Sequence, residues 1–538
     1  MKKAIAILLT ALLMLTAFVS CEGDIEDMFG KTVSFNGNGS TSGQMAEMKV
    51  KKGEEVTLPA NEFTRTDYVF AGWNTQADGS GTGYADKAKA SFDDNTVLYA
   101  QWAEELTITF NANDGSGTMD PVKVSAGVYE LPKNGFTAPD GYAFVRWSKT
   151  SEGEVEYEVG DELKVTEDVT LYAIWAKVLS TTPDDLLNGR YTITENTPID
   201  KRFGASGTLK LYLLDGKTLN ATQGISVTDG NTLIIDKVGT KGNGTLLIDG
   251  VGYNFAGIGG DKYDEKRTAG EIIINGGTVT ATGGDSAAGI GGGYEGAGGT
   301  VTINGGIVTA MGGGSDNPGG AGIGGGRDGK GGEVTINGGI VKATGGLYGA
   351  GIGGGYYGDG VTVIITGGIV TANGSYGGAG IGGGYGGVGG TLSVSDGTVV
   401  ANGGNNGAGI GSGSGGGKGG EVTINGGTVI ANGNGGGTGI GGGAASDGGT
   451  VTISGGTVKA SSNTNDVPAI GAGQNNYTHG KLTIGYAKLQ TNSLVINTGW
   501  SLYYGNSENP TDHVDGPHDA NDISSYVRRY MNVTQPST

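Results

Sequence analysis

The sequence predicts an all-β protein in which two small strand-rich modules precede a right-handed parallel β-helix solenoid with about 30 residues per coil. Three observations support this fold class. Val, Ile and Thr alternate with polar residues in short runs, one early segment occurs twice, and a Gly-rich unit recurs along the second half. The 538 residues include 114 Gly and 11 Pro without a Gly-X-Y period, which excludes collagen.

The duplicated segment predicts two modules, residues 32–103 and 104–177. Aromatic residues recur between the copies at offsets of 73 to 75 residues: Phe35 with Phe110, Trp73 with Trp147, and Trp102 with Trp175. Each copy contains alternating runs such as "VLYAQW", which are typical of strands. Because the Trp residues stand among other apolar side chains, we expect them to form module cores rather than sugar-stacking platforms.

Two motifs in these modules carry a family resemblance. "FAGWN" at 70–74 and "LYAQW" at 98–102 resemble the Listeria-Bacteroides repeat, the internalin-type B repeat that occurs in tandem on bacterial surface proteins. The resemblance covers about 145 residues of this sequence. It implies a β-grasp-like fold that serves as a spacer or a ligand-contacting module outside the cell, and it implies no catalysis.

The Gly-rich region, residues 178–500, predicts the β-helix. Its unit reads "GGTVTINGGTVTA", then a Gly-rich stretch and "AGIGGG". The central Ile returns every 29 to 33 residues, as Ile258, Ile290, Ile323, Ile352, Ile381, Ile410, Ile440 and Ile470. One unit offers three brief strands and is too small to bury its own inner face. Stacked units would bury that face, with about 4.8 Å of axis per coil.

Alternation within the unit predicts which side chains point inward. Val301 and Ile303 are expected inside and Thr302 outside. The same register predicts an inner column of Ile274, Ile303, Ile336, Ile365, Val394, Ile424 and Ile453. It also predicts a turn column in which side chains hydrogen-bond along the axis: Asn275, Asn304, Asn337, Thr366, Ser395, Asn425 and Ser454. The region resembles the repetitive β-helix domains of bacterial surface proteins, some of them related to carbohydrate-binding β-helices.

The segment "GIGGGYGG" at 380–387 contains the G-x-G-x-x-G pattern of dinucleotide-binding turns. That pattern needs a following helix whose N-terminal amides bind the pyrophosphate. The residues after Tyr385 alternate like a strand instead, and the motif recurs in several coils. We therefore expect a corner of the coil, where Ile381 enters the core and the glycines permit sharp bends.

The two ends of the chain read differently from the repeats. Lys2 and Lys3 precede an apolar run, so residues 1–20 predict a signal peptide of the lipoprotein type, followed by a linker at 21–31. "FVSC" resembles a bacterial lipobox and implies lipidation of Cys21, the single cysteine of the chain. An ordinary signal peptide with an unrelated cysteine is the alternative. Residues 501–538 break the repeat and predict a C-terminal cap.

One surface column is the predicted ligand-binding site. The residue directly after "GIGGG" is Tyr294, Arg327, Tyr356 and Tyr385 in four successive coils, and Tyr357 adjoins it. In register these side chains would form a strip of aromatic faces with one guanidinium, suited to a linear glycan or peptide. The alternative is that tyrosine simply covers a Gly-rich surface.

Three other patterns suggest sites that the sequence leaves open. Asp261, Asp264 and Glu265 form a calcium site or ordinary loop charges. The three histidines are His479, His513 and His518. The last two have a metal-like spacing with Asp512, Asp515 and Asp519, although a polar cap turn explains them equally. The outward Thr columns suggest a flat ice-binding face, but Glu271, Glu333, Glu421 and Lys342 interrupt them.

These observations predict an exported, non-enzymatic cell-surface lipoprotein that acts as an adhesin or carbohydrate-binding protein. The formal charge of -20 disfavours nucleic acid as a partner. The expected partners are an extracellular glycan or host matrix, and the membrane through the lipid on Cys21; no cofactor or metal is expected. A β-helix polysaccharide lyase or glycoside hydrolase is the alternative. Those chemistries need a pair of carboxylates, or calcium together with a base.

Overall fold

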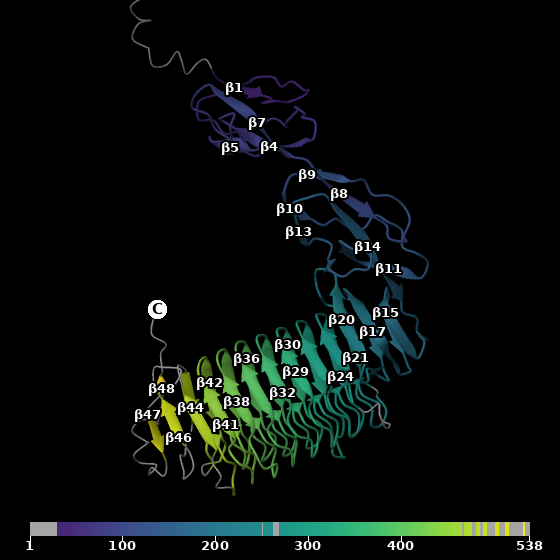
Figure 1. Ribbon diagram of the computed structural model, residues 1–538, viewed down its shortest axis with the longest axis vertical. Helices are drawn as coiled ribbons and strands as arrows, with labels where there is room; N and C mark the ends of the chain where they lie inside the picture. Colours follow the sequence, from purple (N-terminus) through teal and green to yellow (C-terminus); the bar gives the residue numbers. More distant parts are fainter. Residues whose placement is uncertain are drawn as a thin grey trace, which may run out of the picture. The chain divides into compact units, whose positions relative to one another are not determined.

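The computed structural model describes residues 30–249, 251–261, 268–464, 467–475, 480–484, 488–491, 501–504, 512–515 and 531–532. Every regular element in these ranges is a β-strand (Figure 1), so the predicted all-β class is confirmed. No helix in this part of the chain has the length and apolar character needed to span a bilayer. The chain forms two compact units, Met1–Thr137 with Arg146–Ile174, and Ala138–Val145 with Trp175–Thr538.

The first module is a five-stranded sheet in the order β2-β1-β7-β4-β5, with a separate antiparallel pair of β3 and β6. Its strands are β1 (Lys31–Asn36), β2 (Met48–Val50), β3 (Val56–Thr57), β4 (Tyr68–Asn74), β5 (Gly83–Tyr84), β6 (Lys89–Ala90) and β7 (Thr96–Glu104). β1 runs parallel to β7 and antiparallel to β2. β4 is antiparallel to both β5 and β7.

The second module repeats this topology strand for strand. Its strands are β8 (Leu106–Asn111), β9 (Val122–Val124), β10 (Gly127–Glu130), β11 (Tyr142–Ser148), β12 (Glu156–Tyr157), β13 (Glu162–Val165) and β14 (Val169–Val178). β8 is parallel to β14 and antiparallel to β9, and β10 pairs with β13 as β3 does with β6. The internal duplication read from the sequence is therefore a duplication of structure.

The Trp residues of the two modules differ in how deeply they are buried in the cores. Trp73 and Trp147 are buried, and the ring of Trp73 lies 4.9 Å from those of Phe35 and Phe70. Trp102 and Trp175 are half-buried, and Trp102 packs against the core cluster without lying inside it. Trp102 lies toward the end of β7, where it covers the edge of the core and its indole N–H donates to the Gly37 carbonyl at 2.9 Å.

The β-helix begins with longer strands. These are β15 (Leu186–Thr192), β16 (Thr197–Ile199), β17 (Phe203–Leu214), β18 (Thr218–Ala221), β19 (Ile225–Ser226), β20 (Thr232–Val238) and β21 (Thr245–Ile248). All pair in parallel with their counterparts in the next coil, for example β17 with β20 and β18 with β21. These strands establish the register that the repeated coils continue.

Each repeated coil contributes three strands, and each strand stacks on its counterpart in the next coil. Sheet 1 contains the four-residue strands β23 (Glu271–Ile274), β26 (Thr300–Ile303), β29 (Glu333–Ile336), β32 (Thr362–Ile365), β35 (Thr391–Val394), β38 (Glu421–Ile424) and β41 (Thr450–Ile453). Sheet 2 contains the five-residue strands β24 (Thr278–Thr282), β27 (Ile307–Met311), β30 (Ile340–Thr344), β33 (Ile369–Asn373), β36 (Thr398–Asn402), β39 (Thr428–Asn432) and β42 (Thr457–Ser461). The predicted parallel β-helix is confirmed.

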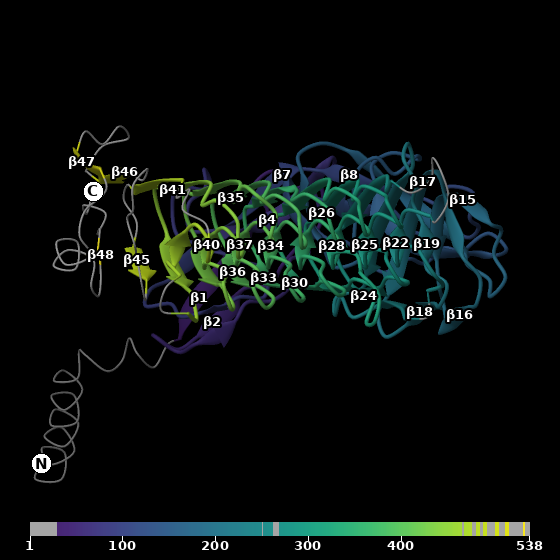
Figure 2. The ribbon, with the colours of Figure 1, turned by 90° about the horizontal axis from the view of Figure 1, so that it is seen from below.

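The third strand of each coil is a two-residue Ile-Gly segment at a corner. These corner strands, several of which follow one another in a row in Figure 2, are β22 (Ile258–Gly259), β25 (Ile290–Gly291), β28 (Ile323–Gly324), β31 (Ile352–Gly353), β34 (Ile381–Gly382), β37 (Ile410–Gly411), β40 (Ile440–Gly441) and β43 (Ile470–Gly471). Gly382 has φ 135°, and a Cβ there would lie 1.9 Å from the carbonyl oxygen of Gly411 in the next coil. The corner is therefore a turn of the coil rather than a phosphate loop.

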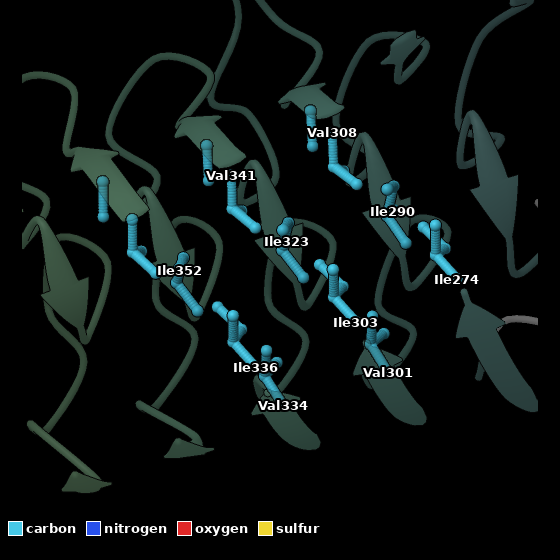
Figure 3. Packing of buried hydrophobic residues seen from close by; sticks show 14 of the residues in the cluster. Ile274, Ile290, Val301, Ile303, Val308, Ile323, Val334, Ile336, Val341 and Ile352 are labelled. Atoms are coloured by element: carbon cyan, nitrogen blue, oxygen red, sulfur yellow. The ribbon is translucent and has the colours of Figure 1, made fainter. Parts of the chain in front are cut away.

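The interior is a set of aliphatic columns (Figure 3). Ile303 pairs in register with Ile336, and Ile336 with Ile365; all three are fully buried. Val301 is also inside while Thr302 is half-exposed, as the alternation predicted. Burying one such side chain stabilises the fold by about 1.5–3 kcal/mol relative to exposure, so repetition of the column supplies much of the driving force for stacking.

Polar side chains reinforce the stack at its turns. Asn304 Nδ2 donates to Asn275 Oδ1 at 2.8 Å, and Asn337 Nδ2 donates to Asn304 Oδ1 at 2.8 Å. Thr366 continues this column by donating to Asn337 at 2.7 Å. A second column at the ends of sheet 2 strands was not predicted: Asn373, Asn402, Asn432 and Ser461.

The strand pattern changes at the C-terminal end. β44 (Lys481–Ile484) and β45 (Lys488–Thr491) continue the parallel ladders of β41 and β42. β46 (Ser501–Tyr504) is parallel to β44, but β47 (Asp512–Asp515) is antiparallel to β46. β48 (Met531–Asn532) is antiparallel to β45. The direction of pairing thus reverses beyond the last parallel coil.

Candidate functional site

The structure stacks the predicted surface column at the corner of four successive coils. The guanidinium carbon of Arg327 lies 5.7 Å from the ring centroid of Tyr294 and 5.7 Å from that of Tyr356. The rings of Tyr356 and Tyr385 are stacked, with centroids 5.8 Å apart and an interplanar angle of 18°. At about 4.8 Å per coil, this column extends over about 14 Å of the axis.

Tyr357 widens the column, as its position beside Tyr356 suggested. Its ring centroid lies 4.1 Å from that of Tyr356 and 6.1 Å from that of Tyr385. The side chain is 56% exposed, whereas Tyr356 and Tyr385 are half-buried. Tyr357 therefore offers the most accessible aromatic surface of this group.

Two further tyrosines belong to the site and were missed in the sequence. The Tyr348 ring lies 5.3 Å from Tyr356, 5.5 Å from Tyr376 and 5.5 Å from Tyr385. Tyr348 and Tyr376 precede the corner strand of their coil, whereas the predicted residues follow it. We call the seven residues together the aromatic strip: Tyr294, Arg327, Tyr348, Tyr356, Tyr357, Tyr376 and Tyr385.

The fold brings the two sides of the corner together through the backbone. The N–H of Tyr385 donates to the carbonyl of Tyr348, in the turn of the preceding coil, at 2.8 Å. Residues far apart within a Gly-rich stretch thereby become neighbours. The spacing along the chain gave no hint of this contact, but a bulky Tyr in turns otherwise made of Gly, Asn and Ser was a usable signal.

Two tyrosines of the strip have strained backbones. Tyr348 has φ 69° and Tyr357 has φ 57°, while the equivalent residues one coil later are Gly377 and Gly386. A left-handed conformation costs a residue with a Cβ about 1–2 kcal/mol, and bulky residues rarely adopt it. The position of Tyr357 is also left-handed at Glu295, Asp328 and Ala445 in other coils, so this backbone conformation belongs to the turn of the repeat.

Glycines lie directly beneath two of the rings. A Cβ at Gly386 would lie 2.3 Å from the ring of Tyr357, and one at Gly377 would lie 2.6 Å from the ring of Tyr385. The rings therefore rest against bare backbone of a neighbouring turn. This support holds them in fixed orientations and reduces the entropy that a ligand would have to remove.

The strip is close to electrically neutral. Arg327 Nε lies 3.2 Å from Asp328 Oδ2, which balances the one guanidinium. A hydrogen bond to Glu295 raises the pKa of Tyr294, and burial raises it further. A hydrogen bond to Tyr357, followed by burial, raises the pKa of Tyr356 to about 12. These phenols consequently remain uncharged hydrogen-bonding groups at neutral pH.

Family models match both halves of the chain. The Listeria-Bacteroides repeat domain matches residues 32–101 and 107–174. The beta helix repeat matches seven segments: 272–294, 301–327, 334–356, 363–385, 392–414, 422–444 and 451–474. The chain contains Listeria-Bacteroides repeats within residues 32–174 and beta helix repeats within residues 272–474. Both resemblances read from the sequence are confirmed.

The beta helix repeats place the aromatic strip within the array. The first four matched segments end at Tyr294, Arg327, Tyr356 and Tyr385, and the last three end at Ser414, Ala444 and Gln474. The same structural position thus carries large planar side chains in four consecutive repeats and small or flexible ones afterwards. The strip is a local feature of the array and not a requirement of the repeat.

Two relatives come from Evansella cellulosilytica. One, a "Putative Gly-rich membrane protein", is 31% identical over 159 residues, which cover 27% of this chain and 18% of that protein. The other, a "Putative membrane protein", is 29% identical over 157 residues, which cover 27% of this chain and 22% of that protein. The matched segment thus spans about a fifth of each relative. No solved structure matches the chain.

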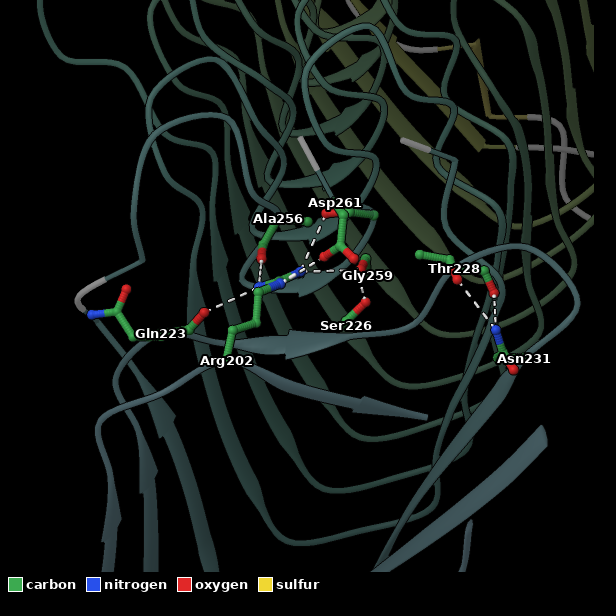
Figure 4. A network of polar contacts seen from close by, with 9 residues as sticks. Arg202, Gln223, Ser226, Thr228, Asn231, Ala256, Gly259 and Asp261 are labelled. Atoms are coloured by element: carbon green, nitrogen blue, oxygen red, sulfur yellow. Dashed lines mark hydrogen bonds and ion pairs between the residues drawn. The ribbon is translucent and has the colours of Figure 1, made fainter. Parts of the chain in front are cut away.

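Asp261, one member of the suggested calcium site, belongs to a polar cluster at the start of the beta helix repeats (Figure 4). Its Oδ1 lies 2.7 Å from Arg202 Nε, and its Oδ2 accepts a hydrogen bond from Ser226 at 2.8 Å. Arg202 also donates to the carbonyls of Gln223 and Ala256. With both carboxylate oxygens engaged, Asp261 serves to pair a buried guanidinium.

The remaining predicted residues fall mostly outside the described ranges. Cys21, Asp264, Glu265, His479 and His518 lie there, and so does Asp519; His513, Asp512 and Asp515 belong to β47. Among the residues that the structure describes, no group of three or more His, Cys, Asp or Glu is arranged to hold a metal ion.

A groove of about 600 Å³ follows the starting ends of the first strands of sheet 1 and the turns before them. Glu271 and Glu333 line it, with Thr300 between them in register. Thr232 donates to Glu271 at 3.0 Å. The groove is lined chiefly by Gly, Thr and acidic residues, so it is polar and carries negative charge.

Proposed function

We propose that this chain is a non-enzymatic cell-envelope protein that binds a linear glycan along the aromatic strip. Envelope placement is supported by the signal-like N-terminus with Cys21 and by the membrane proteins that the chain resembles. We further propose that Cys21 carries a lipid anchor. In this scheme the Listeria-Bacteroides repeats are spacers and the beta helix repeats form the binding rod of an adhesin or carbohydrate-binding protein.

The observation that carries the proposal is the strip itself. Planar side chains from successive coils stack along the axis, and Tyr348 and Tyr357 pack against them. Aromatic faces pack against the apolar faces of sugar rings, and the spacing of coils is close to the length of one hexose unit in a linear polymer. A ligand that repeats along its length suits a surface that repeats in the same way.

Charge favours a neutral glycan over an anionic one. Arg327 is balanced by Asp328, and the acidic side chains of Glu295 and Asp359 lie on neighbouring turns. A polymer of uronic acids would meet this negative surface and the net charge of the chain, -20. The phenol hydroxyls of the strip can still hydrogen-bond to sugar hydroxyls.

One observation favours the competing class, a polysaccharide-degrading enzyme. Glu271 and Glu333 share a groove, and their strands are about 10 Å apart along the axis, just beyond the roughly 6.5–9.5 Å that separates the carboxyl groups of inverting glycosidases. Both side chains are exposed, however, and a general acid needs burial to raise its pKa. The described residues that line the groove include no Lys, Arg or His to abstract a proton. Binding therefore remains the better-supported function.

Affinity gel electrophoresis of the full-length protein tests the proposal. The probes are a neutral β-linked glucan, a xylan, a mannan and polygalacturonate. We expect retardation by a neutral polymer, and Tyr356→Ala or Tyr385→Ala should weaken binding roughly tenfold. Tyr68→Ala is the matched control, because Tyr68 is a surface tyrosine with the Arg65 guanidinium 4.0 Å from its ring, but it lies in a Listeria-Bacteroides repeat.

Reducing-sugar and unsaturated-product assays on the same polymers separate binding from turnover. Binding without product supports the proposal. Turnover that is lost in Glu271→Gln or Glu333→Gln would assign the chain to the enzyme class. Binding that survives both strip substitutions would remove the strip as the site.

A further inference from the structure

The outer face of sheet 2 differs from the rest of this acidic protein. Its seven strands, β24 to β42, have no Asp or Glu at any outward position, and their only charged outward residues are Lys342 and Lys459. The chain as a whole contains 54 acidic residues. Sheet 1, in the same coils, carries Glu271, Glu333 and Glu421 on its outer face.

An aliphatic column lies along one edge of this face, at the first residue of three strands. Ile307, Ile340 and Ile369 are paired in register on consecutive strands and are 48%, 49% and 51% exposed. Val400 and Ile430, the third residues of β36 and β39, add half-exposed apolar surface next to this column, where the column position itself is Thr398 and Thr428. Single exposed apolar residues are ordinary, but an aligned group on a flat sheet is typical of a contact surface.

We propose that this face joins two copies of the chain by two-fold packing of sheet 2 on sheet 2. Charge supports a second copy as the occupant. Two molecules with a net charge of -20 repel each other wherever acidic surfaces meet, and the outward positions of these seven strands carry no acidic side chain. A two-fold contact brings the same face of both copies together, so a face without carboxylates avoids this repulsion.

The register of the strands fits a two-fold axis that runs parallel to β33, the middle strand of the seven, in the plane between the two sheets. Ile369 would then meet Ile369 of the other copy. Lys342 on β30 would face β36, and Lys459 on β42 would face β24, so the like charges do not meet. Ile307 and Ile340 would pack on Thr428 and Thr398, the residues at the same register position of β39 and β36.

The size of the face predicts a modest affinity. Seven strands of five residues cover about 34 Å by about 16 Å, or roughly 1,100 Å² for two copies together. Specific interfaces begin at about 1,000 Å² of total buried area, so we expect a reversible dimer. This contact does not depend on the glycan-binding function, because the strip lies at the corner outside sheet 2.

Sedimentation equilibrium of the purified full-length protein tests the inference. The wild-type chain should show a concentration-dependent monomer–dimer equilibrium. Ile369→Lys should weaken association at least tenfold. Ile364→Lys is the matched control: it makes the same substitution at an outward position of the same coil, five residues earlier, but on sheet 1. It should leave association unchanged.

Circular dichroism melting of both variants checks that they fold. A wild-type chain that stays monomeric up to roughly 100 µM would overturn the inference, since the dissociation constant of the dimer would then be too high for a specific interface. Equal loss of association in both lysine variants would also overturn it, because a general charge effect would then explain the result.

Discussion

The ring of Tyr356 lies parallel to that of Tyr385 within 18°, and the two centroids are 5.8 Å apart. These residues are separated by one coil of the chain. Their stacking therefore depends on the register of adjacent coils, which the corner strands β31 and β34 maintain by pairing Ile352 with Ile381. The binding surface is only as well ordered as this register.

Substitution of Gly382 tests the register. Gly382→Ala places a Cβ 1.9 Å from the Gly411 carbonyl and imposes φ 135° on an L residue, so we expect the coils there to separate and the melting temperature of the β-helix to fall sharply. Gly415→Ala is the control, because Gly415 has φ 71° and nothing within 4 Å of its Cβ position. It should cost about 1 kcal/mol. Equal effects would contradict the close approach of the coils.

Titration of Tyr356 tests the hydrogen bond within the strip. Its pKa is raised from 10.0 to about 12, chiefly by the bond to Tyr357, which favours the protonated phenol. The bond thus stabilises the folded strip below pH 10, and this contribution is lost as the pH rises to about 12. Tyr357→Phe removes the partner, so the pKa of Tyr356 should fall toward 10.

The measurement is the tyrosinate absorbance of each protein with that of a matching Tyr356→Phe protein subtracted. The difference isolates Tyr356 from the other 22 tyrosines of the chain. A Tyr356 midpoint that is the same with and without the Tyr357 hydroxyl would show that the hydrogen bond has no effect on the phenol.

Much of the fold could be predicted because it repeats. The alternation around Val301 and Ile303 set the inward side, and the recurring Ile set the coil length. The partial exposure of Trp102 could not be predicted, because it depends on where β7 reaches the edge of its sheet. Likewise Tyr348 joins the strip only because the chain folds back at the corner. Glu333 and Lys342 both interrupt the outward Thr columns in the sequence. In the structure they lie on different faces, Glu333 on sheet 1 and Lys342 on sheet 2.

Strain at Tyr357 predicts a separation of stability from binding. Tyr357→Gly relieves a left-handed backbone and removes ring contacts, and these effects oppose each other. We expect the free energy of unfolding to change by less than about 1 kcal/mol, while glycan binding falls severalfold. Denaturant unfolding and affinity gels measure the two quantities.

Ala445→Gly is the matched control for backbone strain. Ala445 has φ 57° at the position equivalent to Tyr357, three coils further on. Its replacement relieves the same strain without touching the strip, so stability should rise slightly and binding should stay constant. If Tyr357→Gly left binding intact, the strained tyrosine would have no role in the site.

The buried Arg202 predicts a large effect on stability. Arg202→Met leaves Asp261 without its partner and several carbonyls without a donor, which we expect to cost about 3–5 kcal/mol. The neighbouring Lys201→Met breaks only an exposed pair with Asp185 and should cost less than about 1 kcal/mol. Thermal unfolding followed by circular dichroism compares the two; similar losses would argue against a structural role for the Arg202 cluster.

The dependence of affinity on ligand length tests the central claim most directly. Isothermal titration of a series of oligosaccharides, cut from the neutral polymer that binds best in the gels, measures how many sugars the strip contacts. Because the corner column extends over about 14 Å, affinity should rise with each unit up to about four sugars and then level off. The rise should disappear in Tyr356→Ala. Affinity that does not change with length, or a length dependence that survives this substitution, would contradict a glycan bound along successive coils.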